Sequence, residues 1–332
     1  MAFYLGIGRR RRINIVIKDH VIRYVESKQS HLDGIGTQGE LYLPPGLIVN
    51  GTIKDEDELY RRLAPLVKER KWKNRAVQFI VPDPYVVVRK MKVPPSIPEK
   101  ELKGYLYMEL DTTVHLPFKD PYMDVIPLHK ETEDGQEILL IAAPAEIVNT
   151  YTHLFSKLKM DPVTADISPL ALYRLYEEAI QGAGEGHLLL IQFDYEKVTV
   201  SIFDGDKPLF MRTMNLLLPE NGWEVAEEEN GKTNIQYLQV ETIGEGHIRE
   251  TITEILRMIN YYQFSLQGGM AQIDRAILCG EHPLLDKMHE QLQAELGIAV
   301  CSIHGVIRQA LHLDSSWGHY ELAIGLALRG GN

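Results

Sequence analysis

Two strand–turn–strand segments carry the residues that say most about chemistry. The first is predicted to pair Ile13–Ile17 with Val21–Val25, and the second His187–Phe193 with Val198–Phe203. A hairpin that binds phosphate needs glycine in its turn, because glycine has no Cβ and can adopt positive φ. A carboxylate at the end of the first strand would hold magnesium, which prefers oxygen ligands. Neither turn in this sequence contains a glycine.

Other side chains stand at the ends of the first strands and in the turns. These are Val16 and Lys18 in the first hairpin, and Gln192 and Asp194 in the second. A lysine can meet a phosphate as a point charge, whereas the charge of Asp194 repels one. Two interpretations stay open. Either the hairpins have lost a nucleotide site, or they keep one that depends on Lys18 alone.

Composition limits the class of protein. The 332 residues with 45% hydrophobic content suggest two domains, and the formal charge of −11 argues against a general nucleic-acid binder. The chain has only two cysteines, Cys279 and Cys301, so a disulfide framework is absent and a reducing cytoplasm is favoured. No stretch approaches the ~18 apolar residues that span a bilayer.

The first residues form a segment of their own. Met1–Gly8 is apolar, and Arg9–Arg12 is entirely basic. We expect residues 1–12 to be a flexible basic tail. The alternative is a weak contact with an anionic membrane surface, to which basic residues are attracted.

No catalytic or metal site is expected. His282 and His289 lie seven residues apart, which leaves Cys279 without a close ligand pair for zinc. No serine stands in a nucleophile elbow. The acidic run Glu227–Glu229 is typical of a solvated surface.

The order of elements indicates a duplicated core. A third strand at Leu209–Met214 follows the second hairpin and repeats the layout near the start of the chain. We expect one lobe over 13–167 and a second over 168–332. A polar insertion over about 221–246 is expected to be a mobile loop with one short strand at Ile235–Val240. A helix begins after Asp55, and Pro65 is expected to kink or split it.

An ordered series of segments resembles the PilM family of type IV pilus assembly proteins. The series is Leu43–Ile53, Val77–Pro82, Val86–Pro94, Leu116–Phe118, Ile141–Pro144, Leu278–Gly280 and Ala323–Arg329. The resemblance implies an actin-like α/β fold of duplicated ribonuclease-H-like lobes, with an inserted α/β subdomain over about 40–128. It also implies that Val77–Pro82 and Val86–Pro94 are two strands of that subdomain.

The departures from the family pattern concern the nucleotide loops. The pattern has aspartate and glycine where this chain has Val16 and Lys18, and again where it has Gln192 and Asp194. Of the glycines at the adenosine loop only Gly280 remains. The resemblance therefore implies a scaffold that needs no cofactor. The alternatives are an actin-like switch that still binds ATP and magnesium, and a divergent kinase. A kinase would need an acidic base near the cleft, and the sequence identifies none.

The resemblance also implies a partner. In the family, the cleft between the first core subdomain and the insertion receives the N-terminal peptide of a bitopic, PilN-like inner-membrane protein. Val87, Arg89, Met91 and Lys92 give a mixed apolar and basic strand that suits capture of an extended peptide.

These implications place the protein at the cytoplasmic face of the cell membrane, in a type IV pilus or competence-pseudopilus platform. A motor ATPase and self-association are further implied contacts. A cell-division-type membrane tether of the same fold would normally end in an amphipathic helix, whereas this chain ends Leu328–Asn332.

Overall fold

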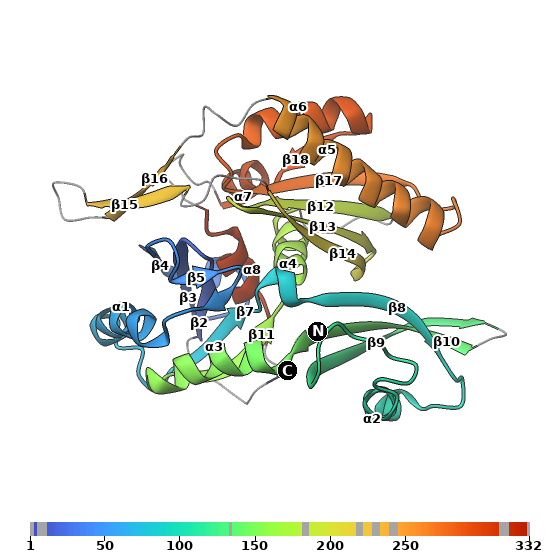
Figure 1. The fold of residues 1–332 in the computed structure, drawn as a ribbon, viewed down its shortest axis with the longest axis horizontal. Coiled ribbons are helices and arrows are strands. Elements are labelled where there is room, and N and C mark those ends of the chain that lie inside the picture. Colours follow the sequence, from blue (N-terminus) through green and yellow to red (C-terminus); the bar gives the residue numbers. More distant parts are fainter. Residues whose placement is uncertain are drawn as a thin grey trace.

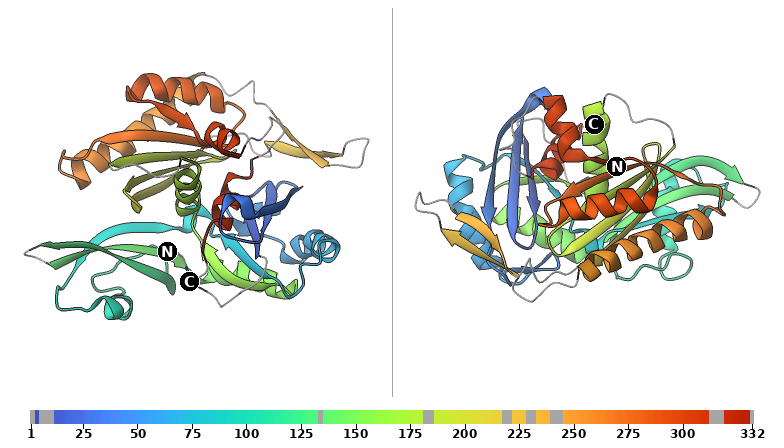
Figure 2. Two further views of the ribbon diagram at one scale, coloured as in Figure 1. Left: turned by 180° about the vertical axis from the view of Figure 1, so that it is seen from behind. Right: turned by 90° about the horizontal axis from the view of Figure 1, so that it is seen from above.

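The computed structural model describes residues 3–4, 12–132, 135–180, 186–216, 222–227, 233–238, 245–311 and 319–330. These residues form two lobes, with α4 (Ser168–Ile180) and α8 (Glu321–Ala327) between them (Figures 1 and 2). The two helices cross closely at Gly325, where a Cβ would lie 2.0 Å from the Ala171 carbonyl oxygen. Although α8 follows the second lobe in sequence, it packs on β2, β3 and β7 of the first.

The first lobe is built on a six-stranded sheet in the order β1-β11-β7-β2-β3-β4. Its strands are β1 (Phe3–Tyr4), β2 (Arg12–Ile17), β3 (Val21–Ser27), β4 (Ile35–Tyr42), β7 (Ala76–Ile80) and β11 (Asp161–Asp166). β2, β3 and β4 are antiparallel neighbours, and β7 and β11 extend the sheet in parallel. Helices α1 (Glu56–Glu69) and α3 (Ala145–Lys157) lie together in this lobe (Figure 1).

The second lobe repeats this plan. Its five-stranded sheet has the order β14-β13-β12-β17-β18. The strands are β12 (His187–Phe193), β13 (Lys197–Asp204), β14 (Lys207–Asn215), β17 (Ile273–Gly280) and β18 (Val300–Ser302). The helices are α5 (Glu245–Asn260), which continues as a π-helix at Tyr261–Leu266, α6 (Leu285–Leu296) and α7 (Ile303–Leu311). Again three antiparallel strands are followed by two parallel ones, so the predicted duplication is confirmed.

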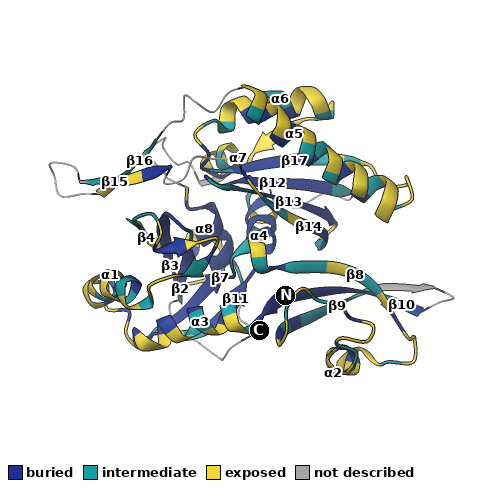
Figure 3. Ribbon diagram, in the orientation of Figure 1, coloured by how far each residue is buried: buried dark blue, intermediate teal, exposed yellow. Residues whose placement is uncertain are grey.

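A separate three-stranded sheet, β8-β10-β9, extends from the first lobe. Its elements are β8 (Val87–Val93), α2 (Leu102–Met108), β9 (Pro121–Thr132) and β10 (Gly135–Pro144). We call it the insertion sheet. The central strand β10 is buried on both faces (Figure 3). Ile138 and Leu140 pack toward α2 in a small core of their own, whereas Leu139 and Ile141 join the main core.

The composition of the insertion sheet corrects one expectation. Val86–Pro94 supplies β8, but Val77–Pro82 supplies β7, which lies between β11 and β2 of the larger sheet. The sequence could not separate the two cases, because a run of buried apolar residues fits any strand covered on both faces. The separate sheet therefore takes residues 87–144, in contrast to the expected insertion over about 40–128.

The structure also bears on two local expectations, for the helix after Asp55 and for residues 1–12. Helix α1 is capped by Asp55 but runs past Pro65 without a break, so the expected split is wrong. Pro65 is exposed, and water can satisfy the carbonyl group that loses its donor there. Of the expected flexible tail 1–12, residues 1–2 and 5–11 lie outside the described residues, while Phe3–Tyr4 forms β1 and Arg12 begins β2.

The described parts of the polar insertion are a two-stranded hairpin, which we call the arm. It comprises β15 (Trp223–Glu227) and β16 (Thr233–Tyr237), so the strand expected at Ile235–Val240 begins earlier. The arm reaches the first lobe, since Trp223 is only 4% exposed and its Nε1 donates to the Leu43 carbonyl at 3.2 Å. The sequence missed this anchor because the surrounding residues are polar.

Candidate functional site

The five predicted nucleotide-loop positions meet in the cleft between the lobes. Val16 and Lys18 come from the β2–β3 hairpin, Gln192 and Asp194 from the β12–β13 hairpin, and Gly280 from the end of β17. All five line one small hollow. The grouping arises because β2, β12 and β17 end at the same cleft. The structure therefore brings together the five positions that the sequence singled out.

Lys18 bridges the two lobes. Its Nζ lies 2.6 Å from Asp194 Oδ1 and 2.6 Å from Glu281 Oε1. Burial opposes the charge of Lys18, but the two carboxylates outweigh it and raise the pKa of the ammonium group above its ordinary value. Lys18 is thus held protonated by two anions between the hairpins of the two lobes.

Glu281 is the centre of this cluster. Its side chain is 1% exposed and also contacts Arg23 at 2.6 Å and His20 at 3.2 Å. Burial alone would raise the pKa of Glu281, but Arg23 and Lys18 hold it well below its ordinary value. Arg23 has a second partner, Glu40, at 3.0 Å. The glutamate that replaces a loop glycine of the family pattern is therefore a buried anion with three basic neighbours.

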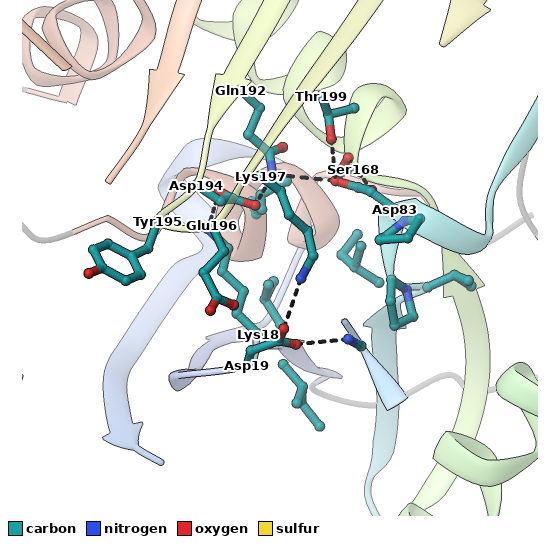
Figure 4. Close-up of a pocket in the computed structure, with 18 of the residues that line it drawn as sticks. Lys18, Asp19, Asp83, Ser168, Gln192, Asp194, Tyr195, Glu196, Lys197 and Thr199 are labelled. Carbon is teal, nitrogen blue, oxygen red and sulfur yellow. Dashed lines mark hydrogen bonds and ion pairs between the residues drawn. The ribbon is translucent and has the colours of Figure 1, made fainter. Parts of the chain in front are cut away.

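Another ion pair joins the hairpins, with the lysine on the second hairpin and the carboxylate on the first. Lys197, the first residue of β13, lies 2.8 Å from Asp19 of the β2–β3 turn (Figure 4). The Asp19 carboxylate also accepts hydrogen bonds from the Asn50 and Gly51 amides, both at 2.8 Å. Each hairpin thus gives a lysine to the other and receives one. We call Lys18–Asp194, Lys18–Glu281 and Lys197–Asp19 the interlobe ion pairs.

A half-buried carboxyl group that the sequence did not single out lies beside these pairs. Asp83 accepts hydrogen bonds from Ser168 at 2.6 Å, Thr199 at 3.2 Å and Gln192 at 3.4 Å (Figure 4). Burial raises the pKa of Asp83 to about 6, with the charge of Asp194 adding to the effect. The sequence identified no acidic base near the cleft, and Asp83 is an acidic side chain at that place. The only sequence signal was its place between Pro82 and Pro84 at the end of a buried strand.

Gly280 is retained for a structural reason. Its φ is +123°, and a Cβ there would lie 1.9 Å from the Phe193 carbonyl oxygen. That oxygen accepts hydrogen bonds from the Glu281 and His282 amides, at 2.8 and 3.2 Å. Only glycine permits this approach. The bend it makes points Glu281 toward Lys18.

The arm packs against the outer side of the hairpins. The Tyr195 hydroxyl donates to the Gly222 carbonyl at 2.5 Å. The His20 ring lies edge-on to Trp223 and Tyr237, with ring centroids 5.8 and 6.3 Å apart. Residues from both lobes therefore meet under the arm, which holds the hairpins together.

Little space is left between the hairpins. The cavity bounded by Lys18, Asp83, Gln192 and Lys197 has a volume of about 60 Å³. Pockets that enclose drug-sized ligands usually measure about 300–1,000 Å³. Among the described residues, no group of three or more histidine, cysteine, aspartate or glutamate side chains is arranged to hold a metal ion. The enclosed space between the hairpins is therefore smaller than such a pocket in this conformation.

The four candidate peptide-binding residues all lie on β8. Arg89 and Lys92 are exposed, and Arg89 donates to the His115 carbonyl at 2.8 Å. Val87 and Met91 are half-buried and pack against the core under α2. Within the insertion sheet β8 is the edge next to β14 of the second lobe, whereas β9 is the edge that touches β1 and α3.

A larger hollow lies between the insertion sheet and the second lobe. Its volume is about 420 Å³, and Lys90, Leu128, Lys207 and Met270 are among its lining residues. Met270 is 90% exposed, and Phe264 nearby in sequence is 66% exposed. This hollow is larger than the cavity between the hairpins, and both β8 and β9 contribute to its lining.

Comparison with known proteins gives one family. A family model described as type IV pilus assembly protein PilM matches residues 15–331. No curated protein matches the chain. None of the helices that the structure describes is long and apolar enough to cross a membrane.

Among solved structures, a "PilM-PilN type IV pilus biogenesis complex" matches with a TM-score of 0.72 and 19% identity, covering 98% of this chain and 100% of that chain. The cytoplasmic domain of EpsL, from the type II secretion system of Vibrio cholerae, gives a TM-score of 0.47 at 10% identity, covering 93% and 98%. MreB5 of Spiroplasma citri bound to AMPPNP gives 0.47 at 8%, covering 92% and 95%. The predicted two-lobed, actin-like α/β fold is confirmed by the duplicated sheets and by the match to the PilM-PilN complex.

The buried cluster predicts a large effect of one substitution. Glu281→Gln should lower the free energy of unfolding by about 3 kcal/mol, because breaking a buried ion pair leaves charges without compensation. We expect the low end of the usual range, since Lys18 keeps Asp194 and Arg23 keeps Glu40. Urea denaturation measures the change. The matched control is Glu290→Gln, the same change at an exposed position of α6, and equal effects of the two would contradict the prediction.

Asp83 predicts a dependence of stability on pH. Its pKa is raised to about 6 from 3.8, so the folded protein binds this proton more tightly than the unfolded chain does. The contribution of the group to stability is therefore gained as pH falls from about 6 toward 4. The unfolding free energy of the wild type minus that of Asp83→Asn should rise over this interval. Parallel urea titrations at several pH values test it, and a constant difference would mean an ordinary pKa.

Proposed function

Because the chain belongs to the PilM family of type IV pilus assembly proteins, we propose that it is a scaffold of a pilus or competence-pseudopilus platform that does not hydrolyse ATP. It acts at the cytoplasmic face of the membrane and binds the N-terminal peptide of a PilN-like bitopic protein. The match to a PilM-PilN complex supports a partner of this kind. Contacts with a motor ATPase and self-association stay predictions.

One observation carries the proposal that nucleotide is not required. The position of a phosphate between the hairpins is taken by Lys18, which is bound to Asp194 and Glu281. A nucleotide would have to displace these carboxylates and then lie next to them, at a cost in like-charge repulsion. The interlobe ion pairs supply a direct attraction between the lobes, which a phosphate with its magnesium would otherwise have to provide.

Titration calorimetry with ATP and magnesium tests this part. We expect no measurable binding, because the cavity is only about 60 Å³ and its one lysine from the first hairpin is already paired. A micromolar affinity that Lys18→Ala removes would overturn the proposal. Lys28→Ala, at an exposed position near the end of the same hairpin, is the control for nonspecific loss of charge.

The peptide site is proposed at the insertion sheet. β8 is an edge strand with exposed Arg89 and Lys92, and an edge strand can accept an extended peptide through its backbone. The half-buried Val87 and Met91 lie on the same strand and link it to the core under α2. These features support the four predicted residues as part of a peptide-binding surface.

Charge reversal tests those residues. Arg89→Glu with Lys92→Glu should weaken binding of the partner's N-terminal peptide about tenfold, since two exposed charges contribute roughly 1 kcal/mol or slightly more together. Thermal shift and calorimetry measure the affinity. The matched control is Lys103→Glu with Lys119→Glu, two exposed positions of the insertion with the same total change in charge. Unchanged affinity in the first variant would move the site away from β8.

A further inference from the structure

Helices α1 and α3 end in the same way, each with a lysine at the position where glycine is usual. Lys71 follows the end of α1 with a φ of 56°, and Lys159 follows the end of α3 with a φ of 61°. In each turn the amide of the next residue donates at 3.0 Å to the carbonyl five residues before it. This is the bond pattern of a helix that ends on a left-handed residue. A side chain with a Cβ is unfavourable in that conformation, so glycine would fit both turns better.

The two turns lie together and form one surface. The Asn74 amide donates to the Lys159 carbonyl at 2.7 Å, so the segment after α1 lies against the segment after α3 (Figure 1). Lys68 and Lys73 lie on either side of Lys71 in sequence, and all four lysines are exposed. Within the part of the chain that the structure describes, none of the four has an ion pair or a side-chain hydrogen bond. We call Lys68, Lys71, Lys73 and Lys159 the lysine patch.

The residues between these lysines are the ones that hold the fold. Trp72 is buried, and its Nε1 donates to a Glu26 carboxylate oxygen at 3.0 Å. Arg75 lies 2.7 Å from the other oxygen of Glu26, and the Arg70 guanidinium lies over the Tyr24 ring, 5.6 Å from its centre. Each of these side chains has a partner within the first lobe. The lysine patch is therefore carried on a fixed backbone while its own charges stay uncompensated.

Charge is distributed unevenly between the two lobes. Residues 13–167 contain 20 lysines and arginines against 23 aspartates and glutamates, whereas residues 168–332 contain 11 against 23. The second lobe thus carries almost all of the net negative charge. A charge distribution of this kind orients a protein with its less acidic lobe toward an anionic surface, and the lysine patch lies on that lobe.

We propose that the lysine patch binds the surface of a bilayer that contains anionic lipids and turns the first lobe toward it. A protein partner fits these side chains less well, because lysine is depleted at protein interfaces, where aromatic residues and arginine dominate. Among the described residues, no large exposed apolar side chain belongs to residues 66–75 or 156–161. That the bilayer is the inner face of the cell membrane rests on the proposed function, whereas the affinity of the patch for anionic lipid does not.

Two full-length variants with the same change in charge test the proposal. Lys71→Gly with Lys159→Gly should weaken binding to vesicles of equal parts phosphatidylcholine and phosphatidylglycerol about thirtyfold in co-sedimentation, since each lysine contributes about fivefold. Because glycine suits both turns, this variant should melt no lower than the wild type. The control, Lys54→Gly with Lys119→Gly at exposed bends of the first lobe, should bind as the wild type does. Vesicles of phosphatidylcholine alone, or high salt, should abolish binding.

A third variant keeps the test independent of the two turns. Lys68→Gln with Lys73→Gln leaves both left-handed positions unchanged and should weaken vesicle binding to a similar extent. The basic run Arg9–Arg12 is the same in every variant, so binding through that run would leave the patch and control variants equal.

The outcomes separate this inference from the proposed function. Absence of wild-type binding to the anionic vesicles, or equal binding by the patch and control variants, would overturn the inference. A glycine variant that melts lower and still binds vesicles as the wild type does would show that the lysines serve the helix ends, and would overturn it too. Vesicle binding through the patch without binding of the partner's peptide would refute the proposed function and leave the lipid site standing. Peptide binding without vesicle binding would do the reverse.

Discussion

The relation between the lobes depends on opposite charges that face each other across a buried cleft. Lys18 from the first lobe meets Asp194 and Glu281 from the second, and Lys197 from the second meets Asp19 from the first. Buried ion pairs contribute little net stability, because desolvation offsets most of the attraction. An unpaired buried charge, however, is very costly. The ion pairs therefore destabilise other lobe orientations more than they stabilise this one. The arm anchored by Trp223 also favours this orientation.

The sequence predicted the elements well where one physical rule sufficed. The alternation of apolar residues and the short turns located both hairpins, and the repeated order of strands indicated the duplication. The prediction from sequence failed where the arrangement of elements or side chains depended on tertiary contacts. β7 and β8 are both apolar strands, and only the fold decides which sheet each joins. Lys18 and Glu281 are 263 residues apart, and a list of altered loop residues does not say that two of them form an ion pair.

The same limit explains why the sequence named residues of the candidate site but not the contacts between them. The family pattern is changed at Lys18 and Asp194 and is kept at Gly280. Each of these comparisons concerns a single residue and needs no structure. The exchange of charges between the hairpins is a property of the pair of lobes. Asp83 illustrates the point, since its raised pKa arises from burial and from the nearby Asp194, neither of which is visible in Pro82–Pro84.

The position of the insertion sheet then limits how a partner's binding is communicated. Its edge β9 touches β1, and its opposite edge β8 touches β14 of the second lobe. Any shift of the insertion sheet is carried by the doubly buried strand β10 to β8, because closely packed layers do not deform independently. A shift of the insertion sheet is thus transmitted to the second lobe through packed side chains. The contact between β8 and β14 and the interlobe ion pairs therefore connect the lobes at two separate places.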